Sequence, residues 1–586
     1  MRVVTAHYSY ASCNGADKLF QLMFPDSSIA QAFSCGEKKC AYVVCYGLAP
    51  YFKQQLQDQV HALDSFVILF DESHNDSTHS KQMDIHIRFF DETRNAVHTR
   101  YLTSAFLGHA TAANMVDAFL DACRCVNLNR MLQLSMDGPN VNWSFYGKLM
   151  AEVHDDSNRK MIDIGSCGLH VVHNAFKAGF EATGWDIKSF LWALFTIFHE
   201  TPARREDFTA ITSSVIFPLK FCLHRWVENS SVAARALVML PHLKMYISVI
   251  EKNPKTYAVP TSKSFATVKL ACRDAFMPAR LMFFESVARQ FEMFLVRYQS
   301  DKPLVPFLDA DLSLLLRGLC RRFLKESVLE TATTSALLSK IDVTDKKGHV
   351  CNPKIDTGFS AAKALKDLGV AKKCSDLGRM TFRDDCKKAL VASTQKLLLK
   401  SPIKYAMTRY LTCLDPRQMV SDSNGCVDNF KRVLHKLVDL HHVNEPDCDL
   451  IGWQFAAYMA EVVAQNHSEF KEFSPDADRL DTFFFKNMEG PLHFSKLWPV
   501  VKKLLVLSHG QATVERGFSI NTQLVVENLK ADSIVSQRTV YDAVSTAGGI
   551  CDVPVTKSML SYVQGARQRY FAHLEEQKKK ATHNTK

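Results

Sequence analysis

The 586-residue sequence has little that would mark a secreted or membrane protein. The residues after Met1 contain no basic segment followed by an apolar one, so no secretory signal is expected. No stretch approaches the ~18 uninterrupted apolar residues that a membrane span requires. The seventeen cysteines are odd in number and are scattered from Cys13 to Cys551 without the spacing of a disulfide framework. These absences predict a soluble intracellular protein with reduced thiols.

Internal repeats are also lacking, and the composition is that of a globular protein. Hydrophobic residues make up 47% of the chain and charged residues 23%. This much apolar material can form a large core, which excludes disordered, collagen-like and coiled-coil chains. At about 100–200 residues per domain, the length predicts about three to five structural units.

Positive charge is concentrated in one segment. The net charge of the chain is +10, and residues 317–404 contain nineteen Lys or Arg against nine Asp or Glu, so this segment accounts for the whole excess. Such a stretch is commonly a solvated surface. A basic strip near the acid-rich residues 445–489 also suits a protein that holds a phosphate backbone.

The first third of the chain alternates predicted strands and helices. Short apolar runs predict buried strands, and alternating apolar and polar side chains at 82–90 predict a strand with one face covered. Three consecutive strands favour a hairpin meander, and the later crossovers favour parallel neighbours, so we expect a mixed sheet. Strands are predicted at 65–70, 82–90, 95–108, 131–136 and 160–164, and helices at 111–123 and 169–181.

After about residue 185, helical spacing of apolar residues dominates. Strand patterns are almost absent from this part of the sequence. The predicted helices are 186–199, 231–250, 267–298, 311–329, 388–400, 495–507, 511–526 and 555–577.

Two acidic residues directly follow predicted strands. Asp71 follows the first apolar run and Asp137 follows the fourth strand. Carboxylates at the ends of neighbouring buried strands lie at one edge of a sheet, where they can share a hard cation. With a third carboxylate they can hold two Mg²⁺ ions for phosphoryl transfer. The alternative is that each is a turn or N-cap residue.

Five motifs in this order resemble those of hAT-superfamily transposases. Asp71-Glu-Ser73 and Asp137-Gly-Pro-Asn140 resemble the first two acidic motifs of the family. The resemblance covers about residues 20–577. The three later motifs are Cys167-Gly-Leu-His170 for the C-x-x-H signature, His224-Arg225-Trp226 for the R-W motif, and Glu515-Arg-Gly-Phe-Ser519 for the E-R-x-F-S block.

The resemblance implies a fold of the α/β plus all-α class. A ribonuclease-H-like mixed sheet would be interrupted by a large helical insertion and followed by a C-terminal helical dimerisation region. The expected regions are an N-terminal helical or linker region at 1–60, the first part of the ribonuclease-H-like domain at 61–184, the insertion at 185–490, the final catalytic helices with the dimerisation region at 491–577, and a basic tail at 578–586.

The resemblance also implies a catalytic triad of Asp71, Asp137 and Glu515 that holds two Mg²⁺ or Mn²⁺ ions. The alternative for Glu515 is a surface helix residue paired to Arg516 or Lys502.

Cys167 and His170 would support the active site without binding metal. They form C-x-x-H-x-x-H with His173, but a structural zinc site needs four ligands and no convincing fourth ligand is present. The cysteines Cys35, Cys40 and Cys45 lack a paired histidine motif and are interpreted as buried thiols.

Further residues are expected to bind DNA. In the family the tryptophan that corresponds to Trp226 stacks on an extruded base, whereas a Trp at a helix start is usually a core residue. His224 and Arg225 are candidate phosphate contacts. From the basic segment the candidate DNA-binding residues are Arg321, Arg322, Lys372, Lys373, Lys387 and Lys388.

The sequence departs from the family pattern in two places. No zinc-finger spacing of the BED type precedes Asp71, so recognition of specific DNA ends is not implied. The segment after Asp71 runs to Asp76 without the common Asp-Glu-Ser-Thr-Asp form, which makes Asp76 an alternative acid.

The expected function is that of a hAT-like transposase or transposon-derived protein in the nucleus. It would cleave and transfer DNA strands and would pair with itself through its C-terminal helices. The rival hypotheses are a domesticated, non-catalytic DNA- or chromatin-binding dimer and a purely structural helical scaffold.

Overall fold

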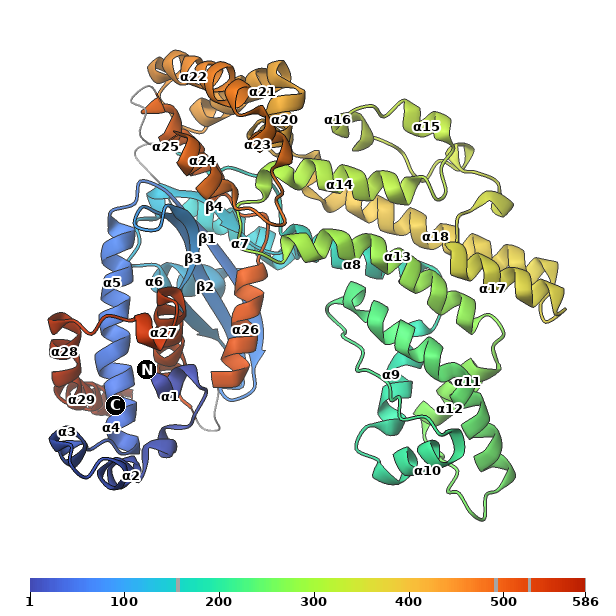
Figure 1. Cartoon of the computed structure of the whole chain (residues 1–586), viewed down its shortest axis with the longest axis horizontal. Helices are drawn as coiled ribbons and strands as arrows, with labels where there is room; N and C mark the ends of the chain where they lie inside the picture. Colours follow the sequence, from blue (N-terminus) through green and yellow to red (C-terminus); the bar gives the residue numbers. More distant parts are fainter. Residues whose placement is uncertain (154–158, 489–493, 525–528, 585–586) are drawn as a thin grey trace. The chain divides into compact units, whose positions relative to one another are not determined.

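The computed structural model describes residues 1–153, 159–488, 494–524 and 529–584 (Figure 1). The chain divides into two compact units. The first contains residues 1–163, 301–304 and 431–586, and the second contains residues 164–300 and 305–430. The helical second unit thus begins and ends earlier in the sequence than the insertion expected at 185–490, whose last residues lie outside the described part of the chain.

A four-stranded mixed sheet forms the centre of the first unit, which confirms the expected sheet type. The strand order is β3-β2-β1-β4, with β1–β2 and β2–β3 antiparallel and β1–β4 parallel. The strands are β1 (Phe66–Asn75), β2 (Ser80–Asp91), β3 (Ala96–Leu107) and β4 (Met131–Ser135).

The fifth strand expected at 160–164 is not formed. Ile162 donates one backbone hydrogen bond to Leu132 of β4 at 2.7 Å, but Lys160 donates to Leu440 at 3.2 Å. The segment therefore touches β4 at one point and turns away to a different partner, so no ladder develops.

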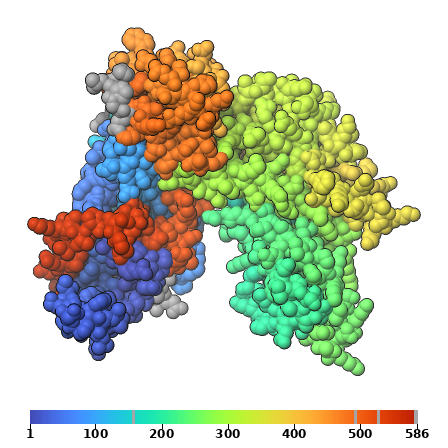
Figure 2. Space-filling model, in the orientation of Figure 1, coloured from blue at the N-terminus to red at the C-terminus, as the bar shows by residue number. Residues whose placement is uncertain are grey.

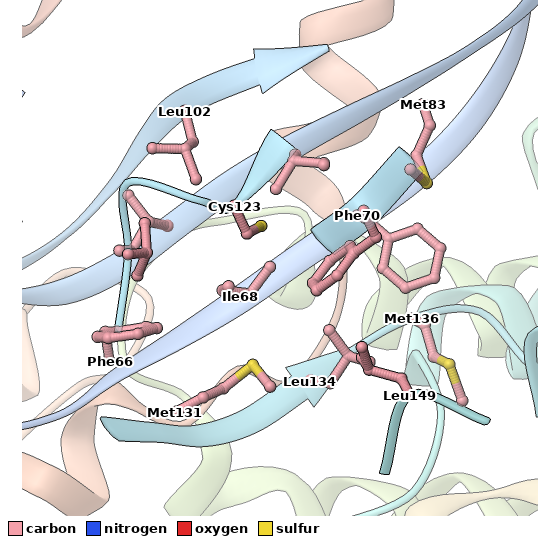
Figure 3. Packing of buried hydrophobic residues seen from close by; sticks show 14 of the residues in the cluster. Phe66, Ile68, Phe70, Met83, Leu102, Cys123, Met131, Leu134, Met136 and Leu149 are labelled. Carbon is pink, nitrogen blue, oxygen red and sulfur yellow. The ribbon is translucent and has the colours of Figure 1, made fainter. Parts of the chain in front are cut away.

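One face of the sheet is apolar. Phe66, Ile68 and Phe70 of β1 pack with side chains of β4, and the group is fully buried (Figure 3). From β2, every second residue joins the same cluster, beginning with Met83 and Ile85. Two helices that follow the strands closely in sequence cover this face: α6 (Ala112–Ala122) and α7 (Asn140–Glu152).

The opposite face is polar, and it is buried as well. Gln82, Asp84, His86 and Arg88 alternate with the apolar residues of β2, and each is at most 2% exposed. The expectation that only one face of this strand is covered is therefore wrong. Three helices from the far end of the chain cover the polar face: α25 (Leu497–Val506), α26 (Ala512–Leu524) and α27 (Ala531–Ala547).

A separate apolar cluster joins the two ends of the chain within the first unit. Tyr51 and Phe52 pack with Val540 and Val544 of α27 and with Met559. The helices of the N-terminal region are α1 (Arg2–Thr5), α2 (Ala16–Met23), α3 (Ser28–Ala32), α4 (Glu37–Val43) and α5 (Ala49–His61). The later helices are α22 (Cys448–Ala457), α23 (His467–Glu472), α24 (Leu480–Met488), α28 (Lys557–Gln564) and α29 (Ala566–Asn584).

The basic tail expected at 578–586 begins within the last helix. α29 continues to Asn584, and residues 585 and 586 lie outside the described part of the chain.

The second unit consists of helices and loops in its described part (Figure 1). Phe176 and Phe180 of α8 pack against Phe284 of α13 at ring distances of 5.0 and 4.7 Å. The helices are α8 (Gly168–Ala182), α9 (Ile187–Phe198), α10 (Pro202–Thr212), α11 (Ser230–Lys252), α12 (Lys263–Arg273), α13 (Met277–Tyr298), α14 (Val305–Cys320), α15 (Glu326–Glu330), α16 (Ser335–Leu338), α17 (Phe359–Val370), α18 (Asp376–Lys400), α19 (Ala406–Tyr410), α20 (Pro416–Ser421) and α21 (Ser423–Asp439), the last continuing into the first unit.

One helical stretch, Trp226–Lys252, is long and apolar enough to cross a membrane by length and composition, although charged and polar residues interrupt its apolar runs. Within its most apolar window, 44% of the residues are buried among other parts of the protein. Core helices of soluble proteins can have the same length and composition, so this single stretch is weak evidence for a membrane span.

Candidate functional site

Asp71 and Asp137 lie at the same edge of the sheet. The last paired residues of the parallel strands β1 and β4 are Leu69 and Ser135. Each aspartate is two residues beyond its member of this pair. Because side chains alternate along a strand, both aspartates continue the row that contains Leu69 and Ser135, on the polar face.

The position of Asp71 differs in one respect from the expected strand end. β1 continues to Asn75, and Asp71 is paired with Asp84 in the antiparallel ladder to β2. Only the pairing with β4 ends before Asp71. The Asp71 carboxylate accepts a hydrogen bond from the Glu72 amide at 2.8 Å.

A buried asparagine orients Asp137. Asn142, in the first turn of α7, is 5% exposed and donates its side-chain amide to the Asp137 carboxylate. Gly138 and Pro139 form the connection between β4 and this helix. The sequence therefore places the aspartate at the end of a strand and its partner one turn into the next helix.

The third acid, Glu515, lies in the first turn of α26 and is half-buried. The residue that precedes the helix, Gln511, is fully buried. Its side-chain amide donates to the carbonyl of Phe70, and to that of Ser135 at 3.3 Å. The start of α26 is therefore fixed to both strands that lead to the aspartates.

These three carboxylates suit hard divalent cations by their chemistry. Carboxylate oxygens are the ligands that Mg²⁺ prefers, and Mn²⁺ accepts the same donors. The site lies entirely within the first unit, and its residues come from β1, the end of β4, and α26.

The structure also contains a buried polar cluster that the sequence did not predict. Asp84 accepts hydrogen bonds from Gln82 at 2.7 Å, from Ser104 at 2.7 Å and from Asn521 of α26 at 2.6 Å. Burial raises the pKa of Asp84, while these donors and the charge of Arg538 act in the opposite direction. The alternation of β2 was the signal for this cluster, because it placed several polar side chains in one row.

His86 lies in the same cluster. Its ring packs edge-on against Tyr101 at 5.6 Å, and neither ring nitrogen has a hydrogen-bond partner in the described part of the chain. Burial, together with the charge of Arg538, holds the pKa of His86 well below its usual value of 6.5.

Asp76 differs from Asp71 and Asp137. It follows the last residue of β1, its side chain is 99% exposed, and it lies 3.4 Å from the ring of His74. An exposed turn residue of this kind has no helix or strand that would fix it beside a second acid.

Trp226 is a core residue of the second unit. It is 4% exposed and its ring packs edge-on against Phe221 at 5.4 Å. The preceding loop is held by Asn229, whose side chain bonds the backbone of Cys222 in both directions at 2.7 and 2.8 Å. Stacking of Trp226 on a base would therefore require this loop to open.

The two residues before Trp226 are more accessible. His224 is exposed, and the half-buried Arg225 forms an ion pair with Glu228 at 3.3 Å.

The candidate basic residues divide into exposed residues, residues in ion pairs, and the buried Arg322. Arg321, Lys372 and Lys373 are exposed; the two lysines lie between α17 and α18, which are drawn in yellow in Figure 2. Lys387 and Lys388 form ion pairs with aspartates three residues earlier, at 3.0 and 2.8 Å.

Arg322 is an exception to the DNA-binding interpretation. It is 4% exposed and its guanidinium donates to the Asp356 carbonyl, to Gln290 and to Ser286 at 3.2–3.3 Å. Burial lowers its pKa. This arginine is committed to the interior of the second unit and is not available to a phosphate.

Cys167 and His170 stand at the start of α8 in the second unit. Cys167 is 2% exposed, and His170 is half-buried. His173, one turn later, is 7% exposed, and its burial lowers the pKa to about 3.

The thiols of Cys35, Cys40 and Cys45 have pKa values raised by burial, with Cys40 at about 12. Of these three, Cys40 is buried and Cys35 and Cys45 are half-buried, so the expectation of buried thiols holds for Cys40 alone.

No protein-family model matches the chain, and no curated protein matches it either.

Proposed function

We propose that this protein is a hAT-like DNA transposase or a protein derived from one, with a ribonuclease-H-like catalytic domain in its first unit. The observation that carries the proposal is the edge of the sheet where Asp71 and Asp137 follow a registered pair of parallel strands. The start of α26 is hydrogen-bonded to the same two strands, and Glu515 lies in the first turn of this helix.

In this proposal Asp71, Asp137 and Glu515 hold Mg²⁺ or Mn²⁺. Bound divalent cations supply charge stabilisation for the attacking and leaving oxygens of a phosphoryl transfer. The protein's own contribution is to orient the ligands: the Asn142 amide fixes the Asp137 carboxylate, and the Glu72 amide fixes that of Asp71. The substrate would be DNA in the nucleus, and the products would be cleaved and transferred strands.

The exposed basic residues support contact with the DNA backbone. Arg321, Lys372 and Lys373 offer cations at the surface of the second unit, whereas Arg322 does not. This support is independent of catalysis, so it also favours the second candidate function, a domesticated DNA-binding protein. In both cases self-association through the C-terminal helices belongs to the proposal.

Strand cleavage with Mn²⁺, on DNA that contains the sequences flanking the gene, tests the catalytic function. Asp137→Asn keeps an acceptor for Asn142 and should still abolish cleavage, because it removes one charged ligand. Asp76→Ala is the matched control and should cleave as the wild type does. If cleavage survives Asp137→Asn but not Asp76→Ala, the proposed assignment of the catalytic acid to Asp137 is wrong.

Binding without cleavage would favour the second candidate. In that case the affinity for DNA should fall steeply with added salt, in proportion to the number of phosphates neutralised. Replacing Lys372 and Lys373 by Ala should remove up to two phosphate contacts. The slope of log affinity against log salt concentration should then fall by up to about two. A chain with no DNA affinity at low salt would refute both functions and leave the structural scaffold.

A further inference from the structure

The connection between α25 and α26 is fixed to β4 by a glutamine. Gln133 is 3% exposed; its amide donates to the Ser508 carbonyl at 3.1 Å and its carbonyl accepts from the Ser508 amide at 2.8 Å. This pair of bonds imitates the pairing of a further strand. The Ser508 hydroxyl then bonds to Gly510 at 2.7 Å, which closes a short turn just before Gln511.

Gln511 continues this attachment at the end of the parallel ladder. The β1–β4 pairing stops at Leu69 and Ser135, and the side-chain amide of Gln511 donates to Phe70 and Ser135. It therefore ties the two strands together where their own pairing ends. Phe70 directly precedes Asp71, and Ser135 is two residues before Asp137.

The geometry of the helix connects this amide to Glu515. The Glu515 backbone amide donates to the Gln511 carbonyl at 2.9 Å, which is the first turn of α26. Residues four apart lie on the same face of a helix, one above the other. The position of Gln511 therefore sets both the height of Glu515 above the strand ends and the direction in which its side chain leaves the helix.

The other half of α26 has its own anchor. Asn521 donates to the buried Asp84 of β2 at 2.6 Å. With one attachment at each end, the helix cannot slide or rotate on the polar face without breaking one of them. Glu515 lies between the two attachments.

We infer that Gln511 is a positioning residue that aligns Glu515 with Asp71 and Asp137 by binding the carbonyls of both aspartate-bearing chain segments. This inference rests on the proposed metal site and adds to it a residue that touches neither metal nor substrate. Gln133 makes bonds of the same chemistry to Ser508, which lies three residues before Gln511. Gln133 is therefore the matched control for a merely structural role.

Mn²⁺ affinity of the full chain, measured by titration calorimetry without DNA, tests the inference. Gln511→Ala should weaken Mn²⁺ binding about tenfold or more, since residues that orient metal ligands commonly contribute that much. Gln511→Glu, which keeps the size but loses the two donated bonds, should weaken it as well. Gln133→Ala should lower the melting temperature like Gln511→Ala and change Mn²⁺ affinity far less.

A double-mutant cycle separates action through Glu515 from a general loss of order. In the Glu515→Ala background, Gln511→Ala should have no further effect on Mn²⁺ affinity. Additive losses, or equal losses for Gln133→Ala and Gln511→Ala, would overturn the positioning role. If instead Asp137→Ala binds Mn²⁺ as tightly as the wild type, the proposed metal site itself is refuted, and the inference with it.

Discussion

Both faces of the central sheet are buried, one by apolar side chains and the other by polar ones. On one face, Phe66, Ile68 and Phe70 pack in an apolar cluster with side chains of the covering helices α6 and α7. On the other face, β2 buries an amide, a carboxylate, an imidazole and a guanidinium in one row. Each of these groups must either find a partner or bear the cost of desolvation.

The two faces constrain the geometry of the layers to different degrees. An apolar face fixes volume but tolerates small shifts, because dispersion contacts have little direction. A polar face fixes angles and register, since a misplaced donor leaves a buried group unsatisfied. The helix that carries Glu515 lies on the face where alignment is set by hydrogen bonds.

The largest effect is expected on the apolar face. Phe119 of α6 is fully buried, with ring distances of 6.0 Å to Phe70 and 5.5 Å to Phe145. Phe119→Ala should lower the free energy of opening of the sheet by about 3–5 kcal/mol, measured by hydrogen exchange in β1 and β2 peptides. The exposed Asp117→Ala on the same helix should change it by less than about 0.5 kcal/mol. Equal effects would show that α6 does not form the core of this face.

The next effect tests the polar face. Asp84→Leu leaves the donors of Gln82, Ser104 and Asn521 without their acceptor, so hydrogen exchange in β2 should report a loss of about 3 kcal/mol. Asp84→Asn retains one acceptor oxygen and should cost less. On a face held by volume the ranking would be reversed, and that result would remove the distinction between the two faces.

A third prediction concerns acid. Because burial lowers the pKa of His86 well below 6.5, the unfolded chain takes up a proton there as the pH falls below about 6.5 and the folded chain does not. Stability of the polar face should therefore fall toward acid, by at most about 1.4 kcal/mol per pH unit. The raised pKa of Asp84 has the opposite effect and favours the folded state toward acid. The other neighbours of His86 are Arg538 and Tyr101.

His86→Leu isolates the histidine in this prediction. Hydrogen exchange in β2 between pH 7.5 and 5.5 should become less dependent on pH in this variant. An unchanged slope would mean that another group takes up the proton.

The smallest effect concerns Gly517 of α26. A methyl group there would lie 2.8 Å from the Arg538 guanidinium and 3.5 Å from the His86 ring. The gain of about 1 kcal/mol that alanine usually brings to a helix should be offset by displacement of the guanidinium. A melting temperature raised by the full gain would show that the polar face has spare room. Ser519→Ala, which is exposed on the same helix, is the control.

Much of the fold is predictable from the sequence, and the predictions that are wrong have physical causes. The four strands of the mixed sheet were predicted from local patterns, which report which side of a strand is apolar. The same patterns cannot report what covers a polar side, because α26 and α27 arrive about four hundred residues later. The strand expected at 160–164 failed since Lys160 bonds to Leu440, a contact that no local pattern encodes.

The candidate site was predictable in part. Asp71 and Asp137 are predictable from their positions after apolar runs, and the register of β1 and β4 places them at one edge. The burial of Arg322 is not predictable, because sequence does not distinguish a buried guanidinium from an exposed one. Gln511 and Asn142 have no sequence signature; their roles depend on the carbonyl or carboxylate that each one meets.

The distance along the chain between the sheet and its second cover has a consequence for synthesis. The apolar face is closed by helices that leave the ribosome almost with the strands, whereas α25 begins at Leu497. At about 5–20 residues per second, the other face waits on the order of tens of seconds for its helices. A row of amide, carboxylate, imidazole and guanidinium groups stays hydrated during that interval. The nascent sheet thus offers neighbouring chains few apolar side chains from β2 on its open side before translation ends.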